Sequence, residues 1–153
     1  MPRPTPEPVD VTKLRELSLA VIAADKFPML ATLDGDQPCV RPVSPLGNEG
    51  FTIYIASLRD SHKTREIEAN AKVELCYMTP GHDQVRLTGI AHEVTDAATR
   101  LDWWTRSPLL RAYIPSAADP RFVLYRVEAG RVRFMREWAL EYFEVPIGEW
   151  RRV

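Results

Sequence analysis

The chain has 153 residues, of which 45% are hydrophobic and 27% are charged, as in ordinary globular proteins. Twenty basic and twenty-one acidic residues give a formal net charge of −1, so the chain lacks the net basic field that holds nucleic acid. No apolar run reaches the ~18–20 residues of a membrane span, and residues 1–10 hold no apolar stretch typical of a signal peptide. Cys39 and Cys76 lie in strand-like runs and suggest buried thiols in a reducing compartment. We therefore expect a cytoplasmic protein with no nucleic-acid or membrane partner.

Proline is the one unusual component, with 13 residues against a usual share of about 5%. Four prolines alternate at positions 2, 4, 6 and 8, a spacing that excludes a helix and favours an extended segment. We predict a proline-rich tail over residues 1–9, a single domain over residues 10–147, and a C-terminal tail over residues 148–153.

The hydrophobic pattern predicts a few helices among many short strands. An apolar stripe at helical spacing follows a capping residue at Asp10 or Thr12 and ends near Ala24. Further helices are expected over about 61–70, after Asp96, and over 109–113. Period-two alternation and turn residues predict strands over 29–33, 38–46, 51–56, 73–77, 84–95, 121–127 and 131–135, with 138–145 as strand or extended tail.

Turns rather than helices join most of these strands, so the sheet should be antiparallel. Gly47 to Gly50 is predicted as one of these turns, and Gly89, in the middle of the longest strand, as a bend or bulge. Many short strands with such a glycine favour a closed or nearly closed barrel over an open sheet.

The common catalytic and metal-binding motifs are absent from the sequence. The three histidines do not stand three or four residues apart, and neither cysteine belongs to a C-x-x-C pair, so no metal site is predicted. There is also no G-x-S-x-G, no G-x-G-x-x-G and no Walker loop.

One segment, from Ser57 to Arg65, joins a strand to the start of a helix and carries polar side chains. Helix N-termini offer free N–H groups and a positive dipole end to an anion. Lys63 opposes that dipole, a conflict that a bound anion would remove. The alternative is a solvated helix end with Lys63 paired to Asp60 or Glu66. Arg41, in the predicted strand over 38–46, would likewise either bind a ligand or place its guanidinium group in water.

The order of these motifs resembles the pyridoxamine 5′-phosphate oxidase-like FMN-binding split barrels, and most of all the general stress protein 26 type. Ser61 and Lys63, with the residues up to Val73, match the pattern S-x-K-x-x-x-I-x-x-N-x-x-V. Short similar stretches lie at 31–35, 41–43, 51–56, 85–91, 119–120 and 122–127, so the resemblance covers about residues 26–138.

The resemblance implies a mainly β fold, a six-stranded antiparallel Greek-key split barrel with inserted helices, that forms a C2 homodimer with FMN at the subunit interface. Lys63 would contact the phosphate, with Ser61 or His62 nearby. The residues along the flavin ring would be Arg41, Pro42 and Val43, and those presenting backbone groups to it would be Ile55, Ala56 and Ser57. Gln84 or Arg86 would reach across from the second subunit.

The resemblance also implies an FMN-dependent oxidoreductase, with a nicotinamide nucleotide or another small molecule as substrate. The R-L-x-P segment of true vitamin B6 oxidases is missing from the sequence, so that activity is not expected. The aromatic side chains of Trp103, Trp104, Trp138 and Tyr113 would either line a substrate pocket or serve packing. The alternatives are a deazaflavin-dependent reductase, a non-catalytic flavin or haem binder with His62, His82 or His92 as axial ligand, or an interaction module without a ligand.

Overall fold

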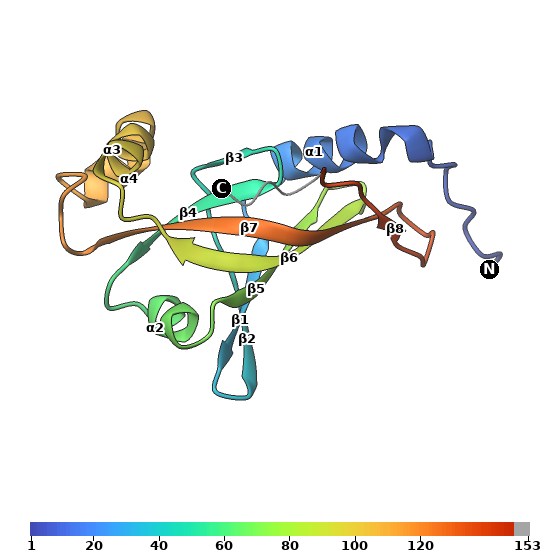
Figure 1. Cartoon of the computed structure of the whole chain (residues 1–153). Helices are drawn as coiled ribbons and strands as arrows, with labels where there is room; N and C mark the ends of the chain where they lie inside the picture. The colour runs from blue at the N-terminus through green and yellow to red at the C-terminus, as the bar shows by residue number, and fades with distance from the viewer. Residues whose placement is uncertain (149–153) are drawn as a thin grey trace.

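An antiparallel sheet is the centre of the computed structural model, which describes residues 1–148 (Figure 1). Within these residues the sheet has eight strands, in the order β2-β1-β5-β6-β7-β4-β3, with β8 paired to β7. The strands are β1 (Met29–Asp34), β2 (Gln37–Pro42), β3 (Gly47–Glu49), β4 (Thr52–Leu58), β5 (Lys72–Met78), β6 (Gln84–Glu93), β7 (Phe122–Met135) and β8 (Phe143–Glu144). The predicted mainly β antiparallel fold is confirmed.

The resemblance implied six strands, and two short ones, β3 and β8, bring the number to eight. The two strands predicted over 121–127 and 131–135 are one continuous strand, β7, because Glu128 and Ala129 pair with β6 instead of forming a turn. β3 has three residues and lies where the sequence predicted only a turn. It forms because these residues pair with β4 in the register Gly47 to Tyr54, and the turn follows at Gly50, which has a positive φ of 58°. In the predicted strand or tail over 138–145, only the two residues of β8 pair with β7.

The barrel is split between β2 and the pair β3–β4, which are the two edges of the sheet. The chain itself joins these edges through residues 43–46. At one end of this connection the Val43 N–H donates to the Pro28 carbonyl at 3.0 Å, and at the other the Leu46 N–H donates to the Tyr54 carbonyl at 2.8 Å. Backbone hydrogen bonds therefore hold both ends of the segment 43–46, which connects the two edges of the split.

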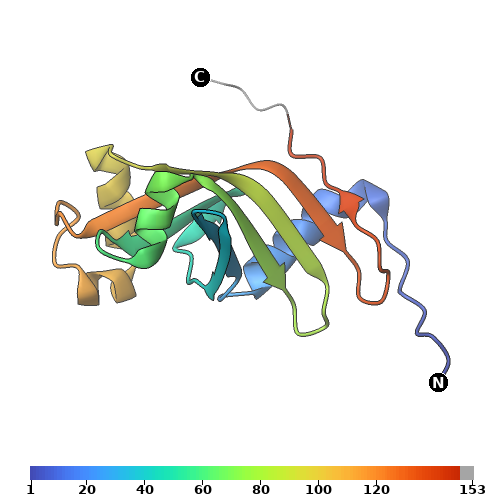
Figure 2. The same ribbon diagram turned by 90° about the horizontal axis from the view of Figure 1, so that it is seen from below.

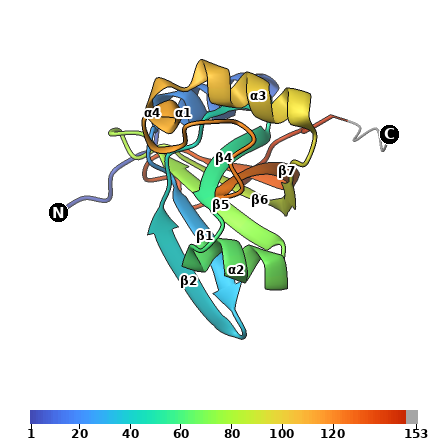
Figure 3. The ribbon, with the colours of Figure 1, turned by 90° about the vertical axis from the view of Figure 1, so that its left-hand side faces the viewer.

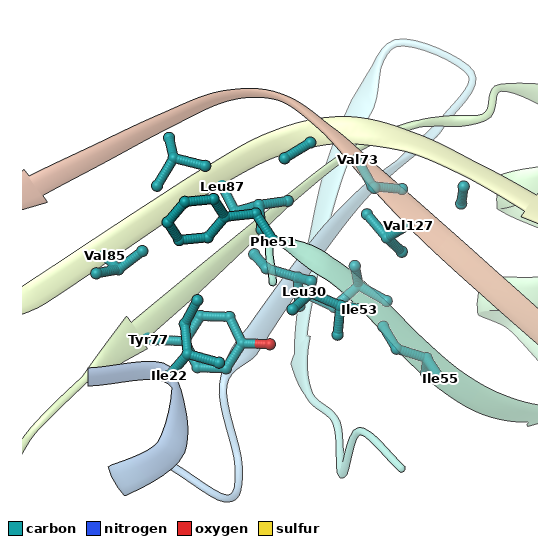
Figure 4. Packing of buried hydrophobic residues seen from close by; sticks show 14 of the residues in the cluster. Ile22, Leu30, Phe51, Ile53, Ile55, Val73, Tyr77, Val85, Leu87 and Val127 are labelled. Atoms are coloured by element: carbon teal, nitrogen blue, oxygen red, sulfur yellow. The ribbon is translucent and has the colours of Figure 1, made fainter. Parts of the chain in front are cut away.

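The main core fills the concave side of the curved sheet (Figure 4). Alternate residues of β4, β5, β6 and β7 point into it, as Val73, Leu75 and Tyr77 do from β5. Burial of this face accounts for the period-two pattern in the sequence.

Two helices pack at opposite ends of this core (Figure 1). A 3₁₀ turn, η1 (Val11–Lys13), is capped by Asp10 and leads into α1 (Leu14–Ala24), which buries Leu14, Val21 and Ile22. α2 (His62–Ala69) contacts β1 and β4 near the split. None of the helices in the described residues is long and apolar enough to cross a membrane.

Two further helices, α3 (Ala97–Arg106) and α4 (Pro108–Tyr113), cover the opposite face of β4 and β7 (Figure 3). The Trp103 ring stacks on Tyr54 at a centroid distance of 4.4 Å. The indole N–H of Trp104 donates to the Ile114 carbonyl at 2.8 Å. Both tryptophans therefore serve packing, whereas Trp138 and Tyr113 are exposed.

The N-terminal segment of the chain lies outside the helices and strands. Residues 1–10 form no helix or strand and lead away from α1 (Figure 2), although Val9 packs partly buried against the main core. The predicted C-terminal tail lies outside the described residues except for Gly148. Cys39 and Cys76 are free thiols and are only partly buried, where buried thiols were expected. Cys76 lies on the outer face of the sheet, opposite exposed Met29.

Gly89 lies at the predicted bulge, where the register between β6 and β7 shifts and Gly130 of β7 is the extra residue. A Cβ at this position would lie 2.3 Å from the Glu128 carbonyl oxygen, too close for the backbone to accept. We expect Gly89→Ala to lower the free energy of unfolding by about 1–3 kcal/mol, the usual cost of overpacking. Denaturant unfolding measures this change. The control is Gly130→Ala, whose Cβ would meet nothing closer than 3.9 Å, and equal losses in the two variants would refute the steric explanation.

Candidate functional site

Three hydroxyl groups form hydrogen bonds with one another at the turn that connects β4 to α2. Ser57 Oγ lies 2.9 Å from Ser61 Oγ and 2.8 Å from Thr64 Oγ1. The Thr64 hydroxyl donates to the Leu58 carbonyl at 2.8 Å, and Ser61 caps the helix by accepting from the Thr64 N–H. Ser57 and Ser61, which the resemblance implies as cofactor ligands, therefore fix the point where α2 begins.

The start of α2 presents donor groups next to the split. As in any α-helix, the N–H groups of its first residues, His62 and Lys63, have no acceptor within the helix. They lie at the positive end of the helix dipole, where anions are stabilised. Thr64, Glu66 and Ile67 are buried against the sheet, so this end of the helix is held in place.

Arg41 is fixed by a buried carboxylate on α2. Its Nη2 donates to Glu66 Oε2 at 2.6 Å, and its Nη1 donates to the Thr32 hydroxyl. The Thr32 hydroxyl in turn donates to the same Glu66 oxygen at 2.5 Å. Hydrogen bonding by Thr32, with the charge of Arg41 added, lowers the pKa of Glu66 below its usual value, so Glu66 is ionised at neutral pH. Arg41 thus has a partner, and its side chain is only 24% exposed.

Lys63 lies beside the cluster formed by Arg41, Thr32 and Glu66, but it has no carboxylate partner of its own. It is three residues from Glu66, a spacing that puts both on one face of the helix, but Glu66 is bound to Arg41. No acidic side chain in residues 1–148 forms an ion pair with Lys63, so neither alternative partner, Asp60 or Glu66, is used. Partial burial, and then the nearby Arg41, lower the pKa of the Lys63 ammonium.

These contacts give the cluster an unbalanced charge. Two cations, Arg41 and Lys63, share the single carboxylate of Glu66, which leaves a net charge of about one positive unit beside the N–H groups of α2. A phosphate or similar anion would satisfy the free donors and relieve the repulsion between the two cations.

The edge of β4 that faces the split carries open backbone groups. β3 pairs with β4 only over Thr52 to Tyr54. In an antiparallel ladder, alternate residues direct their N–H and C=O groups to the same side. Because the Tyr54 carbonyl bonds to Leu46, the backbone of Ala56 faces the same side, beyond the end of β3. A planar polar ligand in the split can bond there.

Most of the remaining predicted residues near the split have side chains packed into the protein, so a ligand would contact their backbone groups. Val43 and Ile55 point into the main core and are 8% and 2% exposed, and the Ala56 side chain packs under α3 and α4. Pro42 is exposed at the end of β2. Residues 41–43 thus lie at the β2 edge of the sheet, and residues 55–57 lie in β4 or, for Ser57, near its end.

Gln84 and Arg86 lie away from this cluster within one chain. β5 begins next to α2 and runs away from it, so Gln84, at the far end of the β5–β6 hairpin, is remote from Lys63. Gln84 accepts from the Tyr142 hydroxyl at 3.2 Å, and Arg86 donates to Glu74 at 2.5 Å. Both residues lie on the outer face of the sheet.

The histidines do not form a site. His62 is exposed at the start of α2, with Nδ1 3.2 Å from Arg65 Nη2. His82 contacts Glu137, and His92 lies 3.8 Å from Glu128. Residues 1–148 contain no group of three or more histidine, cysteine or acidic side chains placed to hold a metal ion.

The family profile for pyridoxamine 5′-phosphate oxidase matches residues 14–136. The chain belongs to the pyridoxamine 5′-phosphate oxidase family. The matched range holds the whole cluster and both sides of the split. No curated relative matches the sequence.

Solved structures share this fold at low sequence identity. A protein from Clostridium acetobutylicum related to general stress protein 26 has 18% identity and a TM-score of 0.74, with 90% of this chain and 97% of that one covered. A pyridoxamine 5′-phosphate oxidase-related, FMN-binding protein from Nostoc punctiforme has 16% identity and a TM-score of 0.63, with coverages of 88% and 86%. A heme binding protein from Mycobacterium smegmatis has 16% identity and a TM-score of 0.70, with 92% of this chain and 59% of that one covered.

Two residues complete the cluster, Thr32 and Glu66. The sequence analysis named Glu66 only as an alternative partner of Lys63 and did not predict its contact with Arg41. Thr32 gave no signal, since a threonine in an apolar strand is ordinary.

Proposed function

We propose that this protein binds FMN in the split between β2 and β4 and acts as a flavin-dependent oxidoreductase. The observation that carries the proposal is the unbalanced charge of Arg41, Lys63 and Glu66 beside the free N–H groups of α2. A doubly charged phosphate at this place supplies the missing negative charge. Family membership and the FMN-binding relative from Nostoc punctiforme support the same ligand.

The residues present fit both parts of such a cofactor. Lys63 and the first N–H groups of α2 would hold the phosphate, with Arg41 at its side and Glu66 keeping the guanidinium in position. The backbone of Ala56 would bond the polar edge of the ring, and Val43 and Pro42 would bound the split on the other side. When bound, the flavin supplies the electron-transfer chemistry, and the protein supplies position and charge. Haem is less well supported, because none of the three histidines is buried beside the split.

We further propose a homodimer in which a second copy completes the site. The outer face of β2, β1 and β5 leaves the side chains of Val40, Met29 and Met78 67%, 46% and 48% exposed. Gln84 and Arg86 lie on the same face of the sheet, where they would be available to the other copy. A self-complementary contact through this face forms a C2 dimer.

The dimer predicts a mass near twice 17.5 kDa in sedimentation velocity at micromolar concentration. Replacing exposed Met29 and Val40 by glutamate should shift the protein toward monomer without unfolding it. A monomeric wild-type protein would contradict the shared site.

The oxidoreductase proposal is tested by anaerobic mixing of the FMN-loaded protein with NADH, NADPH or pyridoxamine 5′-phosphate. We expect bleaching of the flavin absorbance by a nicotinamide nucleotide and none by pyridoxamine 5′-phosphate, since the protein need only position the donor. Fast bleaching by pyridoxamine 5′-phosphate would contradict the exclusion of vitamin B6 oxidation. No bleaching by any of the three would favour a non-catalytic binder.

The absorbance spectrum of the protein as purified separates the alternative cofactors. Flavin bands support the proposal, whereas a Soret band would assign haem and a deazaflavin band would assign the related reductase.

A further inference from the structure

A cleft of about 370 Å³ lies between α3 and residues 115–118, the segment that follows α4 (Figure 3). Its volume falls within the roughly 300–1,000 Å³ of pockets for small organic ligands. Most of the lining is apolar and includes Leu101, Trp104, Pro115 and Ala117. None of the lining residues belongs to the cluster at α2 or to the edges of the split, so the flavin proposal does not account for this cleft.

Among residues 1–148, Arg100 is the one charged side chain that lines this cleft. Its Nη2 donates to the carbonyls of Ala117 and Phe122, each at 3.0 Å, which fixes the guanidinium between the two walls. The guanidinium carbon also lies over the Phe122 ring, 4.6 Å from the ring centre. The other two nitrogens, Nε and Nη1, have no acceptor within residues 1–148, and neither is a buried atom. A positioned cation therefore has N–H groups left for a ligand.

The charge of Arg100 is not matched by an acidic side chain. No ion pair within residues 1–148 includes Arg100, and Glu93, an acidic side chain near it, is bound by Arg59 at 3.0 Å. Asp96, at the start of α3, caps the helix by accepting from the Thr99 N–H at 2.7 Å. The cleft therefore combines apolar walls with one positive charge that has no counter-ion.

We propose that this cleft binds an aromatic monocarboxylate. The carboxylate accepts from the remaining N–H groups of Arg100, whose planar fork matches the two carboxylate oxygens. The ring packs against Leu101 and Trp104. The indole N–H of Trp104 is already bonded to the Ile114 carbonyl, so Trp104 offers the ligand only its apolar ring. An uncharged analogue of the same shape lacks the charge that complements Arg100, and a small inorganic anion lacks the apolar body that fills the cleft. The inference does not depend on the flavin proposal, because the two sites share no residue.

Titration calorimetry of the wild-type protein with cinnamate and with cinnamamide tests the ligand class. We expect cinnamate to bind and cinnamamide to bind at least about 10-fold more weakly, because only the carboxylate makes charge-assisted hydrogen bonds to Arg100. The titration is repeated with FMN in excess. Equal affinity for cinnamate is expected with and without FMN, because FMN is assigned to the split and not to the cleft.

Two exposed leucines provide a matched pair of variants. Leu101→Glu places a carboxylate on the wall of the cleft and should weaken cinnamate binding at least about 10-fold, since the new charge repels the ligand and competes for Arg100. Leu101 is 53% exposed, so the fold tolerates this change. Leu109→Glu is the control, because Leu109 is 64% exposed on α4 and does not line the cleft. Arg100→Gln should abolish the preference for cinnamate over cinnamamide, a ratio that a general loss of stability would not change.

Each other outcome overturns the inference. Cinnamamide bound as tightly as cinnamate would refute the role of the Arg100 charge, and this comparison needs no variant. Cinnamate binding that Leu101→Glu leaves unchanged would place the ligand outside the cleft. Cinnamate displaced by FMN would belong to the cluster at α2, and absence of binding at the solubility limit of cinnamate would leave no site for this class. If FMN itself does not bind, the comparison of the two leucine variants still decides the inference.

Discussion

Replacing Lys63 by alanine is expected to lower the affinity for FMN by roughly 10- to 100-fold and to leave the affinity for riboflavin nearly unchanged. In the proposed site Lys63 would supply a charge-assisted contact of about 1.5–3 kcal/mol to the phosphate, and each factor of ten corresponds to about 1.4 kcal/mol. Riboflavin lacks the phosphate, so only the ring contacts on the β2 and β4 sides of the split determine its affinity. Fluorescence quenching of the two flavins on titration with protein measures both constants.

The matched control is Arg65→Ala. Arg65 is exposed on the same helix and contacts His62 rather than the cluster. Its loss removes an equal charge but should change FMN affinity by less than the loss of Lys63. Equal loss of FMN and riboflavin binding in Lys63→Ala would mean that Lys63 acts on folding and not on phosphate.

Glu66→Gln is expected to destabilise the ligand-free protein and to strengthen FMN binding. The amide oxygen can still accept from Arg41 and Thr32, so the shape of the cluster is kept. Without the carboxylate, however, Arg41 and Lys63 repel each other, and we expect the free energy of unfolding to fall by about 1–3 kcal/mol. The net charge beside the phosphate rises by one unit, which is worth roughly 1 kcal/mol and hence about a fivefold gain in FMN affinity.

The lowered pKa of Glu66 also predicts that the free energy of unfolding decreases at acidic pH. The folded-state pKa of Glu66 is lowered below the ordinary value of 4.5, first by Thr32 and then by Arg41. Its contribution is therefore complete above the unfolded pKa and is lost as the pH falls through the folded one. Glu66→Gln should flatten this slope below about pH 4.5. Glu68→Gln, on the exposed face of the same helix and paired to Arg59, should change neither FMN affinity nor this slope. Weaker FMN binding in Glu66→Gln would show that the negative charge, not the shape, positions Arg41.

The strands and the bulge could be predicted because they depend on local pattern. Alternation at Ile53 and Ile55, and at Val73 to Tyr77, follows from burial of one face of the sheet. Gly89 could be predicted because a mid-strand glycine has few uses other than a bend or bulge. β3 could not, because residues rich in turn chemistry pair only when β4 lies beside them.

The local features of the candidate site could be predicted from the sequence, but the contacts between its side chains could not. The helix start at Ser61 and the cation Lys63 are visible in the sequence as a capping residue followed by a charge that opposes the dipole. The Ser57 hydroxyl contacts Ser61, and Arg41 donates to Glu66, only because the fold brings these segments together. Polar side chains acquire such partners only in the folded chain, and a sequence pattern does not assign them.

The difference in affinity between FMN and riboflavin for the wild-type protein tests the central claim most directly. If the cluster of Arg41, Lys63 and Glu66 at the start of α2 holds a phosphate, FMN should bind at least about 10-fold more tightly, by more than 1.4 kcal/mol. Added inorganic phosphate should compete with FMN and not with riboflavin. Equal affinities for the two flavins, or no binding of either, would contradict the assignment of a phosphorylated flavin to this site.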